Sequence, residues 1–213
     1  MNSELDAAGV TRYLQDHPEF LAEMHIPSPH GDGAISLTER QMQTLREKVR
    51  QLEAKLAELI RFGEENDGIG EKVHHLGVAL LAAGDFATVG RALYSHLGGA
   101  FAVPHVALRL WDAGVALDAP EFAAVGDGAR KQAGALAHPY CGSSNGQEAV
   151  AWLGEGGSHV RSMVLIPLRR DGRTIGALLL ASEEAHRFYA DMGTLYLARI
   201  GDMATAAILR TVA

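Results

Sequence analysis

Cysteine, long apolar runs and a leader segment are scarce or missing in this sequence. Cys141 is the single cysteine among 213 residues, so no disulfide can form within the chain, which suits a reducing compartment. The longest apolar runs, near 77–83 and 175–181, are far shorter than the roughly 20 residues of a membrane-spanning helix. The first ten residues lack the basic and apolar regions of a signal peptide. We therefore expect a cytoplasmic protein with no membrane partner.

The sequence also lacks a strongly basic block. The net charge is −7; residues 1–35 hold one base and six acids, 36–62 six and four, and 63–213 twelve and sixteen. No segment is basic enough to predict neutralisation of nucleic-acid phosphates, so a nucleic-acid partner is not expected. The phosphate-binding G-x-x-x-x-G-K-[ST] and the metalloprotease H-E-x-x-H are absent. These absences predict a protein that is not an enzyme and that carries no cofactor.

A heptad repeat within residues 36–62 organises the chain. Ser36 and Glu39 have the spacing of a capping box, which predicts a helix start. Lys48 falls at a g position and Glu53 at the following e position, the spacing of an interhelical ion pair in a parallel dimer. A seam this narrow cannot be buried within one helix, so the sequence predicts a homodimer. The a and d positions of the seam are Met42, Leu45, Val49, Leu52, Leu56 and Leu59.

The seam resumes beyond Leu59 after a shift in register. Three glycines, Gly63, Gly68 and Gly70, each cost about 1 kcal/mol relative to alanine in a helix. We interpret this region as a soft, kinked continuation of the helix that acts as a hinge. The alternative is a helix that ends near residue 62, with a second one beginning near Ile69. The resumed seam consists of Phe62, Asn66, Ile69, Val73, Leu76 and Leu80.

Two short helices are predicted before the coil. Ser3 is a candidate cap for a helix over 3–16, and Pro18 suits the first turn of a second helix over 19–24. Such helices are not stable alone, so we expect them to pack on the coil or to dock a partner protein. An irregular connector over 25–35 follows. We divide the chain into a short helical segment, a coiled-coil helix and a globular domain: residues 1–35, 36–68 and 69–213.

The globular part has an α+β pattern. Asp171-Gly172 is a hairpin signal, and the long segment 112–146 has only weak patterning, apart from short helices near 120–124 and 128–137. We expect an antiparallel sheet with terminal helices on one face and residues 112–146 over the other. The predicted elements are a helix over 86–98 capped by Asp85, strands over 106–111, 148–153, 161–168 and 173–182, and a closing helix over 187–212.

Several motifs resemble known families. The strand Ser162–Leu168, the turn glycine Gly172, the strand Ile175–Ser182 and the aromatic Phe188 before a last helix resemble the end of a GAF domain. The whole chain is similar to the bacterial domain-of-unknown-function family 484. This resemblance implies a GAF-like domain behind an N-terminal coil, dimeric and with no assigned activity. The motifs that carry the wider likeness are Tyr13-Leu14-x-x-His17-Pro18-x-Phe20-Leu21, Ser36-Leu37-x-Glu39-Arg40-Gln41, Glu65-Asn66-Asp67, Val106–Leu110 and Arg187-Phe188-Tyr189-x-x-Met192-Gly193-Thr194-x-Tyr196-Leu197.

The better-understood GAF classes differ from this sequence at their motifs. The Asn-Lys-x-x-Asp signature of cyclic-nucleotide GAF domains is absent. Free methionine sulfoxide reductases of this fold use several cysteines, and a bilin attaches through a cysteine whose surrounding pattern is not found here. His138 and Cys141 have the H-x-x-C spacing of metal ligands, but two ligands do not make a zinc site. Cys141 beside His138 could instead be a redox-responsive thiol.

A ligand site is predicted on one face of the strand over 106–111. Arg109 and Trp111 share that face, and Trp152 could form a second wall; the alternative is an arginine whose stem covers core aromatics. We therefore predict a non-enzymatic, homodimeric GAF-like sensor or adaptor protein. Its small-molecule ligand would lie between the sheet and residues 112–146. A ligand-free dimerisation scaffold and a thiol-based redox protein are the alternatives. The candidate ligand residues are Arg109, Trp111, His138, Cys141 and Trp152.

Overall fold

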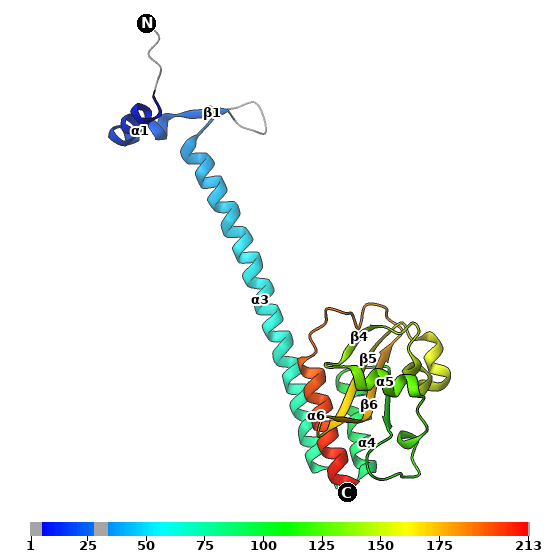
Figure 1. Cartoon of the computed structure of the whole chain (residues 1–213). Coiled ribbons are helices and arrows are strands. Elements are labelled where there is room, and N and C mark those ends of the chain that lie inside the picture. Colours follow the sequence, from blue (N-terminus) through cyan, green and yellow to red (C-terminus); the bar gives the residue numbers. More distant parts are fainter. Residues whose placement is uncertain (1–5, 28–33, 213) are drawn as a thin grey trace. The chain divides into compact units, whose positions relative to one another are not determined.

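The computed structural model describes residues 6–27 and 34–212, and the chain forms two compact units, 1–65 and 66–213. Helix α3 (Leu37–Ala82) contributes to both units and is continuous (Figure 1). The alternative of a break near residue 62 is therefore wrong. Gly63 and Gly68 would have open space around an added side chain, so packing does not require glycine at either position.

The first unit begins with two short helices, α1 (Ala7–Asp16) and α2 (Pro18–Glu23). The Asp6 carboxylate accepts a hydrogen bond from the backbone N–H of Ala8 at 3.3 Å, so Asp6 caps α1. The predicted cap, Ser3, lies outside the described residues. Part of the predicted irregular connector is a two-stranded antiparallel pair, β1 (His25–Pro27) with β2 (Ala34–Ser36). The side chain of Ser36 is not described, so the capping box stays a prediction.

The second unit is built on a four-stranded antiparallel sheet in the order β3-β6-β5-β4. The central strands β5 and β6 form a hairpin, whose turn residues Asp171 and Gly172 have φ values of 50° and 80°. Positive φ at both positions is typical of a type I′ turn, so the predicted hairpin is confirmed. The strands are β3 (His105–Leu110), β4 (Tyr140–Ser143), β5 (Ser162–Arg170) and β6 (Arg173–Ser182).

The two faces of this sheet are covered by different elements. One face carries the larger core with the last turns of α3, α4 (Phe86–Ser95), the π-helical turn η1 (His96–Ala100) and α6 (Leu195–Thr211). The other face is covered by α5 (Asp127–Ala135) and the 3-10 helical segment η3 (Glu148–His159). This two-sided cover confirms the predicted α+β architecture and explains why β5 and β6 are apolar along nearly their whole length.

The structure differs from the predicted secondary structure at three elements. Residues 148–153 are not a strand but the start of η3, in which Gly154 has a φ of 59°. The fourth strand is β4, inside the segment expected to be largely irregular. The closing helix begins at Leu195, so Phe188 and Met192 lie on the preceding turns. Both side chains line one cavity.

Side chains cap the start of α4 and the C-terminal end of α3. The Asp85 carboxylate accepts a hydrogen bond from the Thr88 N–H at 2.7 Å, which lowers the pKa of Asp85 and confirms the predicted cap of α4. Near the end of α6, the Arg210 guanidinium donates to the carbonyls of Leu80 and Ala83 at 2.9 and 2.8 Å. A cation on these terminal carbonyls stabilises the C-terminal end of α3 and holds α6 beside it (Figure 1).

The segment between β3 and α5 is held to the domain by a buried carboxylate. Glu121, in the short 3-10 helix η2 (Pro120–Phe122), accepts a hydrogen bond from the Tyr94 hydroxyl at 2.8 Å. Burial, followed by the hydrogen bond to Glu121, raises the pKa of Tyr94. Phe122 packs against Phe86 with ring centroids 5.2 Å apart. These contacts anchor η2 to α4. The chain that follows η2 continues to the second face of the sheet, where it forms α5.

Candidate functional site

A cavity of about 350 Å³ lies on the face of the sheet covered by α5 and η3. We call it the lid cavity. It is walled by β3, by the chain leading into α5 and by the first turn of η3, which is roughly where a ligand was predicted. Its lining residues are Arg109, Ala123, Ala124, Gly126, Ala129, Glu148, Ala151 and Trp152.

Arg109 and Trp152 meet at this cavity, as the sequence predicted. The Arg109 guanidinium carbon lies 6.0 Å from the centroid of the Trp152 ring system. Two of the five guanidinium N–H donors are used, in bonds of 2.9 Å to the carbonyl of Leu108 and 3.2 Å to the carbonyl of Trp152. Among the described residues no carboxylate forms an ion pair with Arg109. Its charge is therefore available to an anionic group in the cavity.

Glu148 brings an opposite charge into the same cavity. Its carboxylate accepts a hydrogen bond of 2.8 Å from the backbone N–H of Ala129, in the first turn of α5. A side chain at Gly128 would collide with this carboxylate and would have to displace it from its present position. The sequence analysis missed Glu148, because nothing along the chain shows that η3 and the start of α5 meet.

Trp111 does not line the lid cavity, although it lies on the same side of the sheet. Its indole N–H donates to the carbonyl of Thr174 at 3.1 Å, and the Arg130 guanidinium carbon lies 6.0 Å from its ring centroid. These contacts place Trp111 beside the start of β6, so its role as a ligand-stacking wall is not supported.

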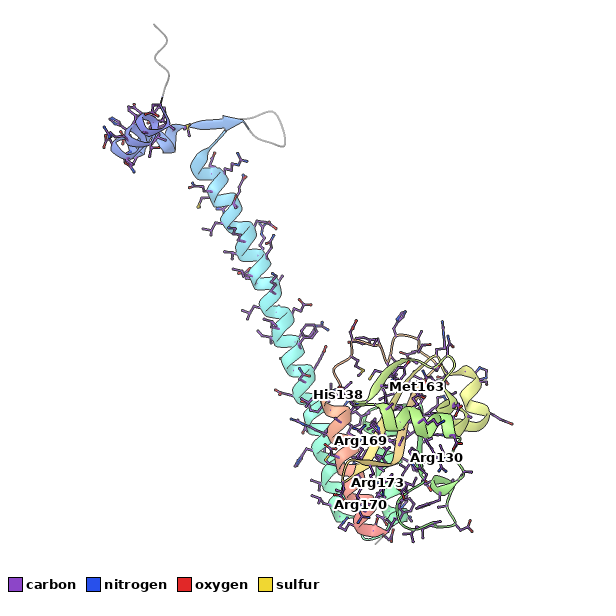
Figure 2. The ribbon with its side chains drawn as sticks, in the orientation of Figure 1. Arg130, His138, Met163, Arg169, Arg170 and Arg173 are labelled. Atoms are coloured by element: carbon purple, nitrogen blue, oxygen red, sulfur yellow. The ribbon has the colours of Figure 1, made fainter. Side chains whose placement is uncertain are left out.

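His138 and Cys141 are not part of the cavity either. Cys141 alternates with Tyr140 along β4, and its side chain joins the core on the opposite face of the sheet from Arg109. His138 is exposed in the bend before β4 (Figure 2). The structure therefore brings only Arg109 and Trp152 of the five candidate residues together at this cavity. No group of three metal-ligating side chains is found in the part of the chain that the structure describes.

Residues 142–146 have the G-x-S-x-G spacing that is also found around nucleophilic serines, with Ser144 at the central position. In this structure Ser144 is buried, and its hydroxyl donates to the carbonyl of Val160 at 2.7 Å. The hydroxyl thus fastens the loop after β4 to the start of β5, and no histidine is hydrogen-bonded to it among the described residues.

The thiol of Cys141 is expected to react slowly. Only 7% of the residue is exposed, and burial raises the pKa of its thiol. A raised pKa leaves less of the reactive thiolate at any given pH. With Ellman's reagent at pH 8, we expect the folded protein to react at least about tenfold more slowly than the same protein in guanidinium chloride. Since the chain has one cysteine, the signal is unambiguous; equal rates would restore the hypothesis of a redox-responsive thiol.

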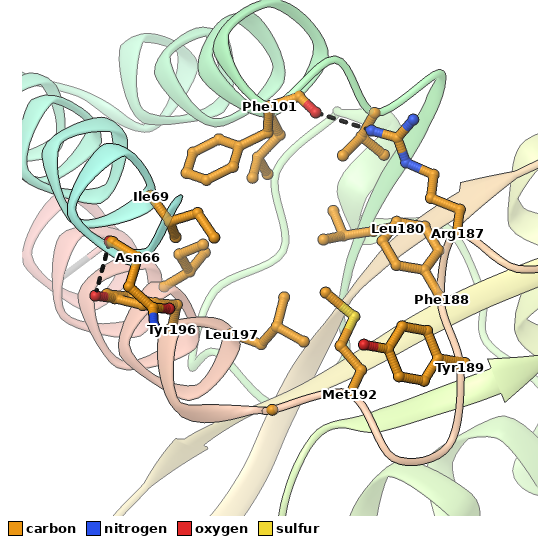
Figure 3. Close-up of a pocket in the computed structure, with 14 residues that line it drawn as sticks. Asn66, Ile69, Phe101, Leu180, Arg187, Phe188, Tyr189, Met192, Tyr196 and Leu197 are labelled. Atoms are coloured by element: carbon orange, nitrogen blue, oxygen red, sulfur yellow. Dashed lines mark hydrogen bonds between the residues drawn. The ribbon is translucent and has the colours of Figure 1, made fainter. Parts of the chain in front are cut away.

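A second cavity, of about 440 Å³, lies on the other face of the sheet (Figure 3). We call it the helix-side cavity. It is enclosed by α3, the turn after α4, β6, the loop before α6 and α6 itself. No feature of the sequence pointed to it, because its walls come from stretches of chain that are far apart in the sequence.

Comparison with known proteins agrees with this architecture. The family described as "Protein of unknown function, DUF484" matches residues 1–212. The chain belongs to this family. The match covers the short helices, the coil and the GAF-like domain together, so the resemblance seen in the motifs is confirmed. The chain is also 27% identical over 218 residues to the uncharacterized protein YigA of Salmonella typhimurium, covering 94% of this chain and 90% of that protein.

A solved structure supports the fold of the second unit. The free methionine-R-sulfoxide reductase from Neisseria meningitidis, in complex with its substrate, aligns with a TM-score of 0.51 over 68% of this chain and 90% of its own. The sequences are 19% identical, so the likeness concerns the GAF-like fold alone. None of the helices within residues 6–27 and 34–212 combines the length and apolar character that crossing a membrane requires.

Proposed function

We propose that this protein is a non-enzymatic, homodimeric regulatory protein, in which α3 pairs two chains and the GAF-like domain binds a small molecule. The observation that carries the proposal is the exposure of the heptad seam. In the single chain, the six a and d side chains from Met42 to Leu59 are between 45% and 66% exposed. A regular apolar stripe of this length on a soluble helix favours a partner helix with the same stripe.

The energetics favour pairing over an isolated helix. Full burial of one Met, Val or Leu side chain contributes about 1.5–3 kcal/mol, and a dimer would bury twelve of them, already partly shielded. The total, on the order of 10–20 kcal/mol, exceeds most estimates of the association cost, about 4–15 kcal/mol. From Val73 onward the resumed seam packs into the domain of its own chain. The pairing surface therefore comprises the seam from Met42 to Leu59.

The experiment that tests pairing is light scattering on the full chain. We expect a particle with twice the 22.7 kDa mass of one chain at micromolar concentration. A particle with the mass of one chain at that concentration would rule out a homodimer of useful stability.

The lid cavity is the proposed small-molecule site. Arg109 and Glu148 present opposite charges to a space bounded by the Trp152 ring and several alanines. Such a lining favours a small zwitterion, or a polar molecule with a flat ring that stacks on the indole. The related fold of the Neisseria reductase also accommodates a small substrate, which supports this class of ligand.

Arg109→Met should weaken ligand retention, because methionine keeps the length of the side chain and removes its charge. We expect a small molecule released by denaturing the purified wild type, identified by mass spectrometry, to be at least about tenfold less abundant in this variant. Arg173→Met, at the exposed hairpin (Figure 2), is the matched control and should retain the ligand. A wild type that releases nothing, or equal retention in both variants, would argue against this site.

A ligand-free scaffold is the second candidate. It is favoured by the two carbonyl bonds of Arg109, which hold the guanidinium in place without a ligand. The thiol-based alternative is disfavoured by the burial of Cys141.

The helices α1 and α2 are the proposed docking surface for a partner protein. Tyr13 lies 4.5 Å from His17 and 5.8 Å from Phe20 between ring centroids, and the Glu19 carboxylate is 3.1 Å from the His17 ring nitrogen Nδ1. In the first unit Val10, Tyr13 and Phe20 are 38%, 51% and 45% exposed. Exposed aromatic clusters are enriched at protein interfaces, so signal output would pass through this surface.

A further inference from the structure

The helix-side cavity has the lining of a ligand site distinct from the lid cavity. Its volume of about 440 Å³ lies within the range of small-molecule pockets, and it occupies the opposite face of the sheet. Figure 3 shows Ile69, Met192 and Leu197 directed toward its centre, from α3, the preceding loop and α6 respectively. An occupant would therefore be surrounded mainly by aliphatic and aromatic side chains.

Arg187 supplies the one charged side chain among the described residues that line this cavity. Its Nη2 donates to the carbonyl of Phe101 at 2.9 Å, and its guanidinium carbon lies 5.6 Å from the centroid of the Phe188 ring. Throughout residues 6–27 and 34–212, no carboxylate forms an ion pair with it. The described hydrogen bonds use one of its five N–H donors, so the others can donate hydrogen bonds to an anion.

Two of the other polar side chains of the cavity, Asn66 and Tyr196, lie at the α3 side, whereas the Tyr189 hydroxyl lies beside Met192 (Figure 3). The Tyr196 hydroxyl donates to the backbone carbonyl of Asn66 at 3.2 Å, which satisfies both groups (Figure 3). Charge is thus confined to the end where Arg187 reaches Phe101, and apart from Asn66 and the two tyrosine hydroxyls the remaining lining is apolar. An apolar space with one unpaired cation at its edge is complementary to a molecule with an apolar body and one anionic group.

We propose that the helix-side cavity binds a small amphipathic carboxylate, with the carboxylate at Arg187 and the apolar chain between Ile69, Met192 and Leu197. Medium-chain fatty acids and arylalkyl acids have this chemistry. The site shares no residue with the lid cavity, so it does not depend on the ligand proposed there. Because Asn66 and Ile69 belong to α3, a bound molecule would contact the same helix that carries the heptad seam.

Calorimetric titration of the whole 213-residue chain with three probes of equal chain length tests the proposal. We expect octanoate to bind at least about tenfold more tightly than octanol, and octylammonium to bind most weakly because Arg187 repels it. In Arg187→Gln, the affinity for octanoate should fall about tenfold while that for octanol is unchanged. Arg173→Gln removes the same charge at the exposed hairpin and should bind like the wild type.

Ile69→Trp fills the cavity without changing its charge and should abolish binding of both octanoate and octanol. This variant keeps the test decisive if Arg187→Gln does not fold. The proposal is overturned if no probe binds at millimolar concentration or if octanol binds as tightly as octanoate. It is also overturned if folded Arg187→Gln binds octanoate like the wild type, or if folded Ile69→Trp still binds it.

Discussion

Leu52→Glu is expected to convert the dimer into monomers. In a parallel coil, residue 52 of each chain would face its copy at a d layer, so the substitution places two carboxylates opposite each other in the seam. Each chain loses about 1.5–3 kcal/mol of leucine burial, and an uncompensated buried charge costs several kcal/mol more. A combined loss of at least about 5 kcal/mol weakens the dissociation constant by more than about a thousandfold. Light scattering over a concentration series measures this shift.

Ala54→Glu is the matched control. Position 54 is an f position on the outer side of the same helix, so it receives the same charge without entering the seam. We expect this variant to remain dimeric. If both variants stay dimeric, the seam is not the cause of pairing. If both variants dissociate, the added charge on the helix causes dissociation, whether or not the residue lies in the seam.

The long helix could be inferred from the sequence because its information is local. The heptad spacing from Met42 to Leu59 predicts a helix with one apolar stripe, whatever the rest of the chain does. The glycines near residue 63 suggested weakness, but they did not end the helix. The described helix passes them because Val73, Leu76 and Leu80 bury its last turns in the domain core, and packing of this kind outweighs intrinsic propensity.

The strands were harder to infer where apolar runs are short. β5 and β6 were recognisable because the Asp171-Gly172 turn fixes their hairpin. The run at 148–153 is short and apolar like a strand, yet it forms η3, which buries Ala149 and packs the partly buried Trp152 against the second face. Periodicity alone cannot separate these cases over six residues. The strand that the sheet uses instead, Tyr140–Ser143, contains a glycine and is too short to stand out.

Only part of the candidate site could be inferred from the sequence. Alternation along a strand shows which residues share a face, but it does not show how strands pair. Alternation along β3 correctly placed Arg109 on one face with Trp111. The position of Cys141 depends on pairing across strands: it lies opposite Val164, whose partner on β6 is Leu180, and this whole row faces the helices. Register between β4 and β5 is set by contacts distant in sequence, so the face of Cys141 could not be predicted.

Leu76→Ala is expected to destabilise the GAF-like domain strongly, because the last turns of α3 are part of its core. Leu76 is 0% exposed within the larger core cluster. Removing a buried leucine side chain costs about 2–5 kcal/mol, depending on how far the surrounding core relaxes. Both tryptophans of the chain, Trp111 and Trp152, lie in the domain, so their fluorescence reports its unfolding in denaturant. The free energy of unfolding should fall by that amount.

Leu81→Ala provides the comparison on the same helix. Leu81 is 76% exposed, so the same truncation should change the free energy of unfolding by less than about 0.5 kcal/mol. Both variants are best measured in the Leu52→Glu background, because dissociation of a dimer would otherwise add a concentration-dependent contribution. Equal effects at residues 76 and 81 would show that the domain does not depend on α3. A large loss at residue 76 alone makes α3 an integral part of the domain, and the helix that carries the pairing seam is then the same one that the domain needs in order to fold.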